Sequence, residues 1–243
     1  MSKVTPLGPD GLGERIGFTQ LAAGEWDNLS VERRVKLGYV RCLTRWGRSK
    51  TTMADVAREA GCSRATVYRL VPGGIDALFD SVKVDQTAEL IEHLWTSVDL
   101  TAPLDDLLVD ICHAAACAMA NNEMLRYLLR YEPAVIEPHV TLRTIEGVLE
   151  VCGREFVPFM SNHIGAERAD RLVEHLVRVV MSYVHSPSSH IDLTLRSDAE
   201  RLVVGFVIPA HFDSAELTQQ HQPPARTQEH DEHHRRTSSQ EPV

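Results

Sequence analysis

The 243-residue sequence predicts an all-α protein of about nine helices, with a small three-helix head and a larger helical body. Apolar residues recur at helical spacing along most of the chain, glycine and proline separate these stretches, and no stretch alternates as a strand would. We expect a flexible arm over residues 1–28, the head over 29–89, the body over 90–212 and a disordered polar tail over 213–243.

The head begins with a predicted helix between Ser30, which can cap it, and Gly47, which ends it. Val35, Tyr39 and Leu43 follow one another at helical spacing on one face of this segment. We therefore expect the first helix to form the platform on which the rest of the head packs.

Two short helices joined by a tight turn are predicted next. Thr52, with Asp55 three residues later, resembles a capping box, and Gly61 supplies the left-handed residue that ends the first short helix. Ser63, with Thr66 three residues later, is the expected N-cap of the second. This second helix carries small and polar residues where a core helix would carry leucine, in the order Arg64-Ala-Thr-Val-Tyr-Arg69. The pattern is typical of a helix-turn-helix.

The remaining helices are delimited mainly by glycine and proline. A breaker cluster over Val71–Gly74 precedes a long helix with Leu78 and Phe79 on its apolar face. Pro158 is expected to kink or end the helix that begins at Pro138. The further predicted helices span 103–115, 123–130, 138–156, 167–186 and 197–211. Ser197 is the expected N-cap of the last one.

The net charge is divided unevenly along the chain. Residues 30–71 hold ten Lys or Arg and three acidic residues, a net charge of +7; the whole chain carries −9, which leaves −16 for the remainder. A single basic head on an acidic body is what attraction to phosphates at one docking surface requires. A merely solvated helical face would not concentrate its basic residues in this way.

The helix-turn-helix, about residues 52–71, is predicted to bind double-stranded DNA with its second helix in the major groove. Arg64 is the candidate base reader, because a guanidinium can form two hydrogen bonds to guanine, and Ala65 and Thr66 can contact thymine methyl groups. The candidate DNA-binding residues, which also include phosphate contacts, are Lys50, Thr51, Thr52, Ser63, Arg64, Ala65, Thr66, Tyr68, Arg69, Gly73 and Gly74.

Tyr68 has two interpretations. Its hydroxyl can bind a phosphate, or its ring can pack at the edge of the core against Trp46 or Phe79. Val67 and Leu70, on the same helix, are expected in the core.

The order of a three-helix head, a connecting helix and an acidic all-α body resembles the tetracycline-repressor (TetR) family of transcriptional regulators. The residues that carry the resemblance are Thr52-x-x-Asp55-Val-Ala57-x-x-Ala60-Gly-Cys-Ser63, Thr66-Val-Tyr68 and Asp76-Ala-Leu78-Phe79. Beyond Leu90 the resemblance is one of architecture only. It implies a homodimer that binds a partly palindromic operator, usually represses, and releases DNA when a small molecule enters the body.

Two positions depart from the pattern of this family. Its members commonly carry an aromatic residue three after the tyrosine and then a phosphate-binding lysine, where this sequence has Val71 and Gly74. We expect the bare backbone N–H groups of Gly73 and Gly74, at the start of the connecting helix, to bind phosphate in place of the lysine.

The body is expected to enclose a ligand pocket. The candidate lining residues, for each of which ordinary core packing is the competing interpretation, are Cys112, Met119, Tyr127, Phe156, Phe159, Met181 and Tyr183. No charged cluster interrupts the apolar stripes, so we expect a hydrophobic or amphipathic effector, such as an acyl or polycyclic compound. The last two helices carry the most regular stripes and are expected to pair with those of a second copy, unless they pack only within the chain.

Neither a cofactor nor a metal site is expected. The five cysteines are odd in number and fall within predicted helices, which favours free thiols in a reducing cytoplasm. Cys112 and Cys117 lie on different faces of one helix and make a poor metal or disulfide pair. His113 and His175 are expected to be hydrogen-bonded core residues, and the tail run Glu229–His234 to be solvated.

Several classes of function are disfavoured by what the sequence lacks. No apolar run is long enough to span a membrane, and the N-terminus has no secretory pattern, so we expect a cytoplasmic, nucleoid-associated protein without a membrane partner. Gly-rich phosphate loops, HExxH and GxSxG are missing, so an all-α enzyme is the weaker alternative. A ligand-independent activator or an architectural DNA-binding protein is the stronger one.

Overall fold

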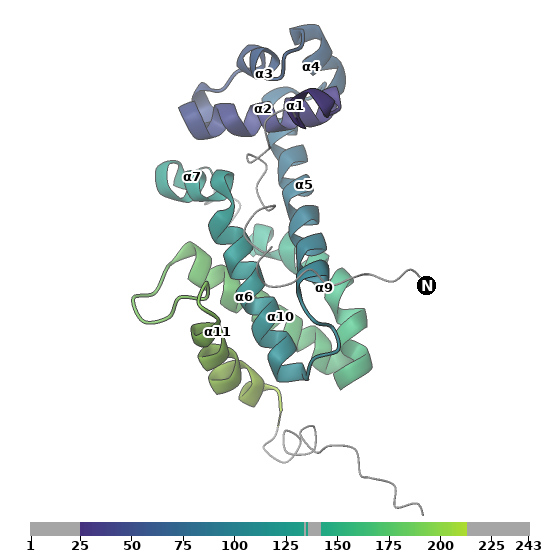
Figure 1. Cartoon of the computed structure of the whole chain (residues 1–243), viewed down its shortest axis with the longest axis vertical. Coiled ribbons are helices and arrows are strands. Elements are labelled where there is room, and N and C mark those ends of the chain that lie inside the picture. The colour runs from purple at the N-terminus through teal and green to yellow at the C-terminus, as the bar shows by residue number, and fades with distance from the viewer. Residues whose placement is uncertain (1–24, 134, 136–141, 213–243) are drawn as a thin grey trace, which may run out of the picture. The chain divides into compact units, whose positions relative to one another are not determined.

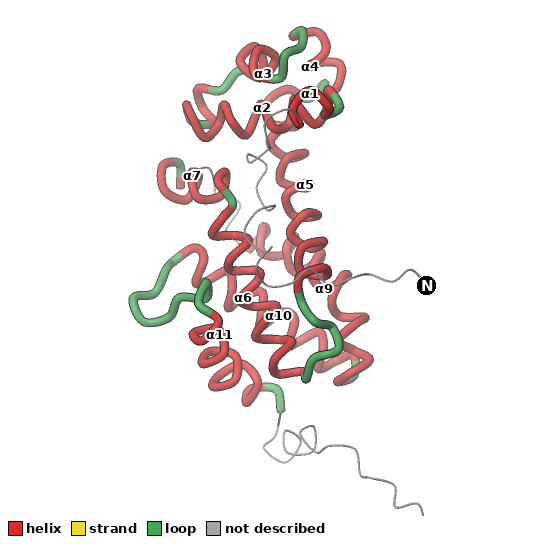
Figure 2. The backbone as a smooth tube through the Cα atoms, in the orientation of Figure 1, coloured by secondary structure: helices red, strands yellow, loops and turns green. Residues whose placement is uncertain are grey.

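The computed structural model describes residues 25–133, 135 and 142–212. Within these ranges all regular structure is helical, in ten α-helices and three short turns of 3₁₀ or π geometry, which confirms the all-α prediction (Figure 1, Figure 2). The predicted arm lies outside the described residues except for α1 (Glu25–Asn28). The predicted tail, 213–243, lies entirely outside them.

The head consists of the predicted helices and one short connecting turn (Figure 1). The platform helix α2 (Val31–Trp46) is followed by a 3₁₀ turn, η2 (Arg48–Lys50). The two short helices are α3 (Met53–Glu59) and α4 (Arg64–Leu70). The predicted helix-turn-helix is therefore present.

Both ends of α2 form as predicted. Ser30 Oγ accepts a hydrogen bond from the Arg33 N–H at 3.2 Å. Gly47 ends the helix with a φ of 89°, in the left-handed region that favours glycine. A Cβ at Gly47 would also meet the carboxylate of Glu132, so a larger residue there would displace that side chain.

The connecting helix α5 (Gly74–Ser97) runs from the head into the body without interruption. The boundary that we expected near residue 89 therefore falls inside a helix. The body helices are α6 (Leu104–Asn121), α7 (Glu123–Tyr131), α9 (Leu142–Ile164), α10 (Ala166–His185) and α11 (Arg196–Leu202), the last continued by a π-helical turn, η3 (Val203–Val207), and a 3₁₀ turn, η4 (Ile208–Ala210).

Proline acts at the helix ends somewhat differently from the prediction. Pro103 takes the N-cap position, so α6 begins one residue later, at Leu104. α9 does not end at Pro158 but continues through it to Ile164, and it is covered along its length by α10. Packing against a neighbouring helix offsets the hydrogen bond that proline removes. Pro138 lies outside the described residues.

The predicted cap of the final helix is wrong. Ser197 lies in the first turn of α11, and the N-cap is Leu195, which has no side-chain cap bond. The polar side chain that orders this helix start is instead Asp198, whose carboxylate accepts from the Asp192 N–H at 2.8 Å. Asp198 thus fixes the preceding loop against the start of α11, and no side chain caps the helix itself.

One buried cluster joins α7 to the head. Met124 and Leu128 of α7 belong to the same cluster of buried side chains as Val35, Leu43 and the other core residues of the head. α7 lies next to α2 in space, far from it in the sequence (Figure 1). In the chain order α7 comes after α5 and α6, so the core of the head is completed by a helix that is distant in the sequence.

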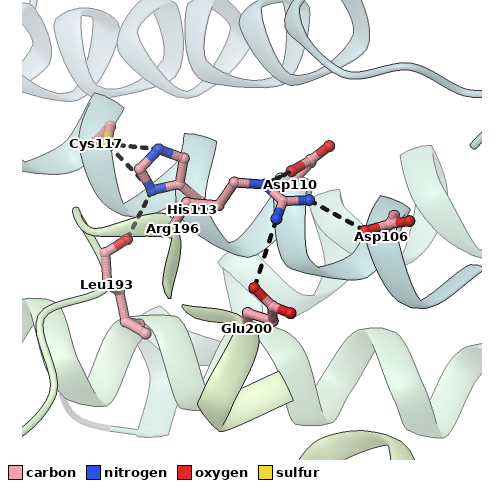
Figure 3. A network of polar contacts seen from close by, with 7 residues as sticks. All are labelled: Asp106, Asp110, His113, Cys117, Leu193, Arg196 and Glu200. Atoms are coloured by element: carbon pink, nitrogen blue, oxygen red, sulfur yellow. Dashed lines mark hydrogen bonds and ion pairs between the residues drawn. The ribbon is translucent and has the colours of Figure 1, made fainter. Parts of the chain in front are cut away.

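The final helical segment is anchored to α6 by polar contacts (Figure 3). Arg196 Nε donates to Asp110 Oδ1 at 2.8 Å, and a second guanidinium nitrogen donates to Asp106 at 3.2 Å. His113 Nδ1 lies 3.1 Å from the Leu193 carbonyl oxygen. These contacts hold the loop before α11 and the start of α11 against one face of α6.

Candidate nucleic-acid interface and ligand cavity

α4 presents one face to solvent and buries the other. Val67 is fully buried, as predicted, whereas Arg64, Ala65 and Arg69 are exposed. Leu70 is 37% exposed, so its predicted place in the core is wrong. It is the last residue of α4, where the chain leaves the helix before the glycine pair.

The turn that positions α4 forms as the sequence predicts. Thr52 and Asp55 make a complete capping box, and the hydrogen bonds from Thr52 lower the pKa of the Asp55 carboxyl. Gly61 has a φ of 65°. Ser63 Oγ accepts from the Thr66 N–H at 3.1 Å, and the two hydroxyl groups lie 2.9 Å apart. Thr52, Ser63 and Thr66 thus use polar groups in capping hydrogen bonds. The residues Thr52 and Ser63 nevertheless remain exposed at the surface.

Tyr68 lies at the surface, with 44% of its area exposed. The alternative of packing against Phe79 is not what the structure shows, because Phe79 packs edge-to-face on Tyr39, with ring centroids 6.5 Å apart. The guanidinium of Arg64 lies 6.0 Å from the centre of the Tyr68 ring. Arg64 and Tyr68, one helical turn apart, therefore share the exposed face of α4.

Thr51 is the exception among the candidate contacts, because its side chain is buried. Its Oγ1 donates to the Gly47 carbonyl at 2.8 Å, and its N–H donates to the same oxygen at 3.1 Å. Thr51 thus fixes the turn between α2 and α3 and offers no side-chain group to DNA. Lys50 and Thr52, on either side of it, are exposed.

The basic residues of the head fall into two groups. An acidic side chain lies within ion-pair distance of Arg33, Lys36, Arg41, Arg48 and Arg58. Within the described residues no ion pair forms at Lys50, Arg64 and Arg69, nor at Arg34 and Arg45. Three of these five unpaired side chains, Lys50, Arg64 and Arg69, are exposed just before α3 and along α4, and the other two lie on α2.

The glycine pair at the start of α5 only partly matches its prediction. Gly73 is exposed and serves as N-cap without a side-chain cap bond. The Gly74 N–H is not bare, because it donates to the Val71 carbonyl at 3.1 Å. A Cβ at Gly73 would lie only 2.6 Å from the Cβ of Ala77, so a larger residue at this cap would displace the first turn of α5.

A contact between α7 and the head was not predicted. Glu132, at the end of α7, accepts a hydrogen bond from the Arg48 N–H at 3.0 Å. The Arg48 guanidinium bonds Asp76 of α5 at 2.6 Å and lies 4.8 Å from the centre of the Phe79 ring. The turn Gly47–Arg48, immediately before the helix-turn-helix, is thus held by both α7 and α5. No local pattern could reveal a pair 84 residues apart in the sequence.

An apolar cavity of about 190 Å³ lies within the body, between α5, α6, α9 and α10. Four of the seven predicted lining residues, Cys112, Met119, Phe156 and Met181, line it. The remaining lining residues were not predicted as part of a pocket. They include Leu90, Leu94, Leu108, Ile111, Met160, Leu176 and Val180. Periodicity predicted that these side chains face inward but not that they leave a space between them.

The other three predicted pocket residues lie elsewhere. Phe159 packs edge-to-face on Trp95, with ring centroids 5.4 Å apart, and does not line the cavity. Tyr127 and Tyr183 line a second, more open and more polar groove of about 800 Å³ between α6, α7, the end of α10 and the loop that follows it. The prediction that these two tyrosines line the apolar cavity is therefore wrong, although both line a groove.

The histidines and cysteines have structural partners. His175 Nδ1 lies 3.0 Å from His211 Nε2, and His113 bonds the Leu193 carbonyl. All five cysteines are free thiols. Among the described residues no group of three or more His, Cys, Asp or Glu is placed to hold a metal ion; the run Glu229–His234 lies outside these residues.

None of the described helices is both long and apolar enough to cross a membrane.

The fold is shared with a solved repressor structure. The TetR family repressor AlkX from Dietzia sp. strain DQ12-45-1b, implicated in biodegradation of n-alkanes, superposes with a TM-score of 0.53 at 21% sequence identity. The match covers 73% of this chain and 95% of the repressor. The chain therefore has the fold of a TetR family repressor, a helix-turn-helix head on an all-α body.

A second solved structure is less similar. The fatty acid degradation regulator FadR from Bacillus halodurans matches with a TM-score of 0.47 at 14% identity, over 77% of this chain and 98% of the regulator. No family model matches the sequence, and no curated protein matches it.

Proposed function

We propose that the protein is a sequence-specific DNA-binding transcriptional regulator, most simply a repressor, that binds a palindromic operator as a homodimer. The observation that carries the proposal is the sorting of basic charge in the head. Lys50, Arg64 and Arg69, at or just before the helix-turn-helix, are exposed and form no ion pair within the described residues, whereas Lys36, Arg41 and Arg58 are paired with acids. Arg34 and Arg45, on α2, are the other basic side chains of the head without an ion pair in the part of the chain that the structure describes. Unpaired, exposed cations are the groups that can neutralise phosphates without first losing a protein partner.

In this proposal α4 enters the major groove. Arg64 reads a base, Ala65 and Thr66 contact methyl groups, and Tyr68 and Arg69 bind phosphates on the exposed face. Lys50 and Thr52 hold the backbone ahead of α3, and the Gly73 N–H adds a contact at the start of α5. Two-fold symmetry places the half-sites roughly 34–36 Å apart, or a multiple of that distance.

The body supplies the regulation in this proposal. A hydrophobic or amphipathic small molecule enters the apolar cavity and shifts α5 and α6, which line it. α5 begins beside α4, and α7 follows α6 directly, so both paths from the cavity lead to the head. The repressor AlkX, with the same fold, is implicated in n-alkane biodegradation, which is in keeping with an apolar effector.

Genome-wide mapping of binding sites, with expression measured after deletion of the gene, tests the regulatory role. We expect a small set of palindromic sites and a rise in expression of the neighbouring genes. Binding without sequence preference would contradict the proposal and favour an architectural protein, and a fall in expression would indicate an activator.

Lys50→Ala tests the phosphate contacts on a site recovered in this way. The variant should weaken binding on all sequences alike and reduce the slope of log affinity against log salt by about one. Arg58→Ala is the matched control, because Arg58 is exposed on the same motif but paired with Asp55. An unchanged slope for Lys50→Ala would remove Lys50 from the interface.

A further inference from the structure

The wall of the apolar cavity offers no charge to a ligand. Of the described lining residues only Thr87, Cys112 and Cys152 carry a polar atom on the side chain, apart from the methionine thioethers. Thr87 Oγ1 donates its proton to the Lys83 carbonyl at 2.9 Å. Burial raises the pKa of Cys112 to about 12 and that of Cys152 to about 11, so both thiols are neutral at physiological pH.

Two arginines on the cavity-forming helices are paired with acids at the protein surface. Arg178 of α10 pairs with Glu174, and Arg154 of α9 pairs with Glu155. None of these four residues lines the cavity. A ligand carboxylate in the cavity would lose its hydration and gain no cation from the described wall, which strongly disfavours its binding.

The size of the cavity limits the ligand further. Its volume of about 190 Å³ is a little larger than an apolar cavity of roughly 150 Å³ that binds benzene in another protein. A compact molecule on the order of six to ten non-hydrogen atoms is therefore suited to it.

From the cavity wall and volume we infer that the effector is a small uncharged apolar molecule, such as a short alcohol, ester or hydrocarbon, and that the carboxylate of the same carbon skeleton is rejected. The inference rests on the proposed function, because it defines the ligand class of the same regulatory cavity. It excludes ionised fatty acids and large conjugates from that cavity.

A matched pair of probes tests the ligand class. Octan-1-ol and octanoate have the same chain length, and at about pH 8 only octanoate is charged. Isothermal titration calorimetry on the purified full-length protein measures both affinities directly. We expect octan-1-ol to bind at least about 30-fold more tightly than octanoate, because the carboxylate is left unpaired. Equal affinities, or tighter binding of octanoate, would overturn the inference.

Two variants locate the binding in the cavity. Ala115 lines the cavity and is buried, so Ala115→Phe should fill it and abolish octan-1-ol binding. Ala114→Phe is the matched control, because Ala114 is on the same helix but does not line the cavity. Thermal unfolding of both variants checks that each is folded, and binding that survives in folded Ala115→Phe would place the ligand elsewhere and overturn the inference.

A charge-introducing variant tests the reason for the preference. Met181 lines the cavity and is half-buried, so the ammonium of Met181→Lys can reach a ligand headgroup at the cavity edge. Octanoate should then gain at least tenfold in affinity, whereas Met181→Leu should leave the preference unchanged. If octanoate gains nothing in folded Met181→Lys, charge pairing does not set the preference and the inference fails.

The outcomes separate this inference from the regulatory role. Binding of both probes with octanoate preferred overturns only the ligand class. If neither probe binds, the neutral ligand class fails, and the ligand-responsive part of the proposed function fails with it. Operator binding in gel shifts without ligand tests the DNA-binding part independently.

Discussion

At the scale of single residues, Arg64 is the side chain to which the proposed function assigns most of the sequence specificity. It is exposed at the first position of α4, it forms no ion pair within the described residues, and the Ser63 cap fixes the helix start beside it. A helix N-terminus of this kind is the part of a recognition helix that meets base edges. A guanidinium there can make two hydrogen bonds to guanine, which neither lysine nor alanine can reproduce.

Arg64→Ala should therefore cost about 1–3 kcal/mol of binding free energy, concentrated at one base position. A gel-shift panel of operator variants, with each position substituted in turn, measures the loss. Arg45→Ala is the control, since Arg45 is an exposed and unpaired arginine of the head that lies outside the helix-turn-helix. If Arg64→Ala weakens every sequence equally, Arg64 contacts phosphate and another residue reads the bases.

Residue-level prediction succeeded where the determinants are close in sequence. The caps at Thr52 and Ser63 and the turn at Gly61 follow from side chains three residues apart or from one backbone conformation. Thr51 shows the limit of such local prediction. From the sequence, a threonine beside a lysine is equally compatible with a surface contact. Its burial depends on the turn that begins at Gly47. Exposure is decided by the packing of whole helices, which local spacing does not contain.

At the scale of helices, the contact between α7 and the head is the feature that would carry regulation most directly in the proposed function. Glu132 bonds the Arg48 N–H, and Met124 and Leu128 lie in the core of the head. Movement of α7 would therefore move the Gly47–Arg48 turn, which precedes the helix-turn-helix. The sequence predicted α7 as a helix, but its packing partner is set by tertiary contacts between distant segments.

Glu132→Ala tests this link. The Arg48 N–H loses a charged acceptor, so the free energy of unfolding should fall by about 1–3 kcal/mol in urea titrations. Ligand binding in the cavity should persist, while the ligand should lower DNA affinity less than it does in the parent protein. Glu132→Gln, which keeps an acceptor oxygen, is the control and should retain most of the response. A full response in Glu132→Ala would show that the signal travels through α5 alone.

The histidine pair between α10 and η4 gives a pH-dependent contribution to stability. Burial lowers the pKa of His211 from its ordinary 6.5, and the nearby His175, Arg171 and Arg168 lower it further. The unfolded chain therefore takes up this proton at higher pH than the folded chain does. The stabilising contribution is complete above about pH 6.5 and is lost as the pH falls through the pKa of the folded state.

His211→Gln should accordingly flatten the fall in stability between about pH 7 and pH 5, measured by urea unfolding at each pH. His190→Gln is the control, since His190 is exposed and lies outside the pair. A parent protein whose stability does not fall over this range, or a variant with the same slope, would show that the pair does not govern the acid response.

At the scale of the whole molecule, the described fold combines two surfaces with different chemistry. Unpaired basic side chains gather on the helix-turn-helix, and large apolar side chains are exposed on the last helical segment, at Val204 and Phe206. The overall charge of −9 gives no sign of the first, and composition gives no sign of the second. The charge division was predicted by counting charges segment by segment, whereas the exposure of Val204 and Phe206 emerges only when residues are assigned to faces of helices.

The exposed apolar residues of the π-helical turn η3 lead to the last prediction, on assembly. Phe206 is 66% exposed, beside Val204 at 45%, on one of the two segments expected to pair with a second copy. Phe206→Glu places a charge in that contact, and light scattering should then give a mass near the monomer value of 27.2 kDa where the parent gives twice that mass. Val84→Glu, at an exposed valine of α5, is the control and should stay dimeric.

Because one protomer can occupy only one half-site, Phe206→Glu should also weaken binding to a palindromic operator far more than to a single half-site. A parent protein that is itself monomeric would reject the dimer, and a dimeric Phe206→Glu would move the interface to another face.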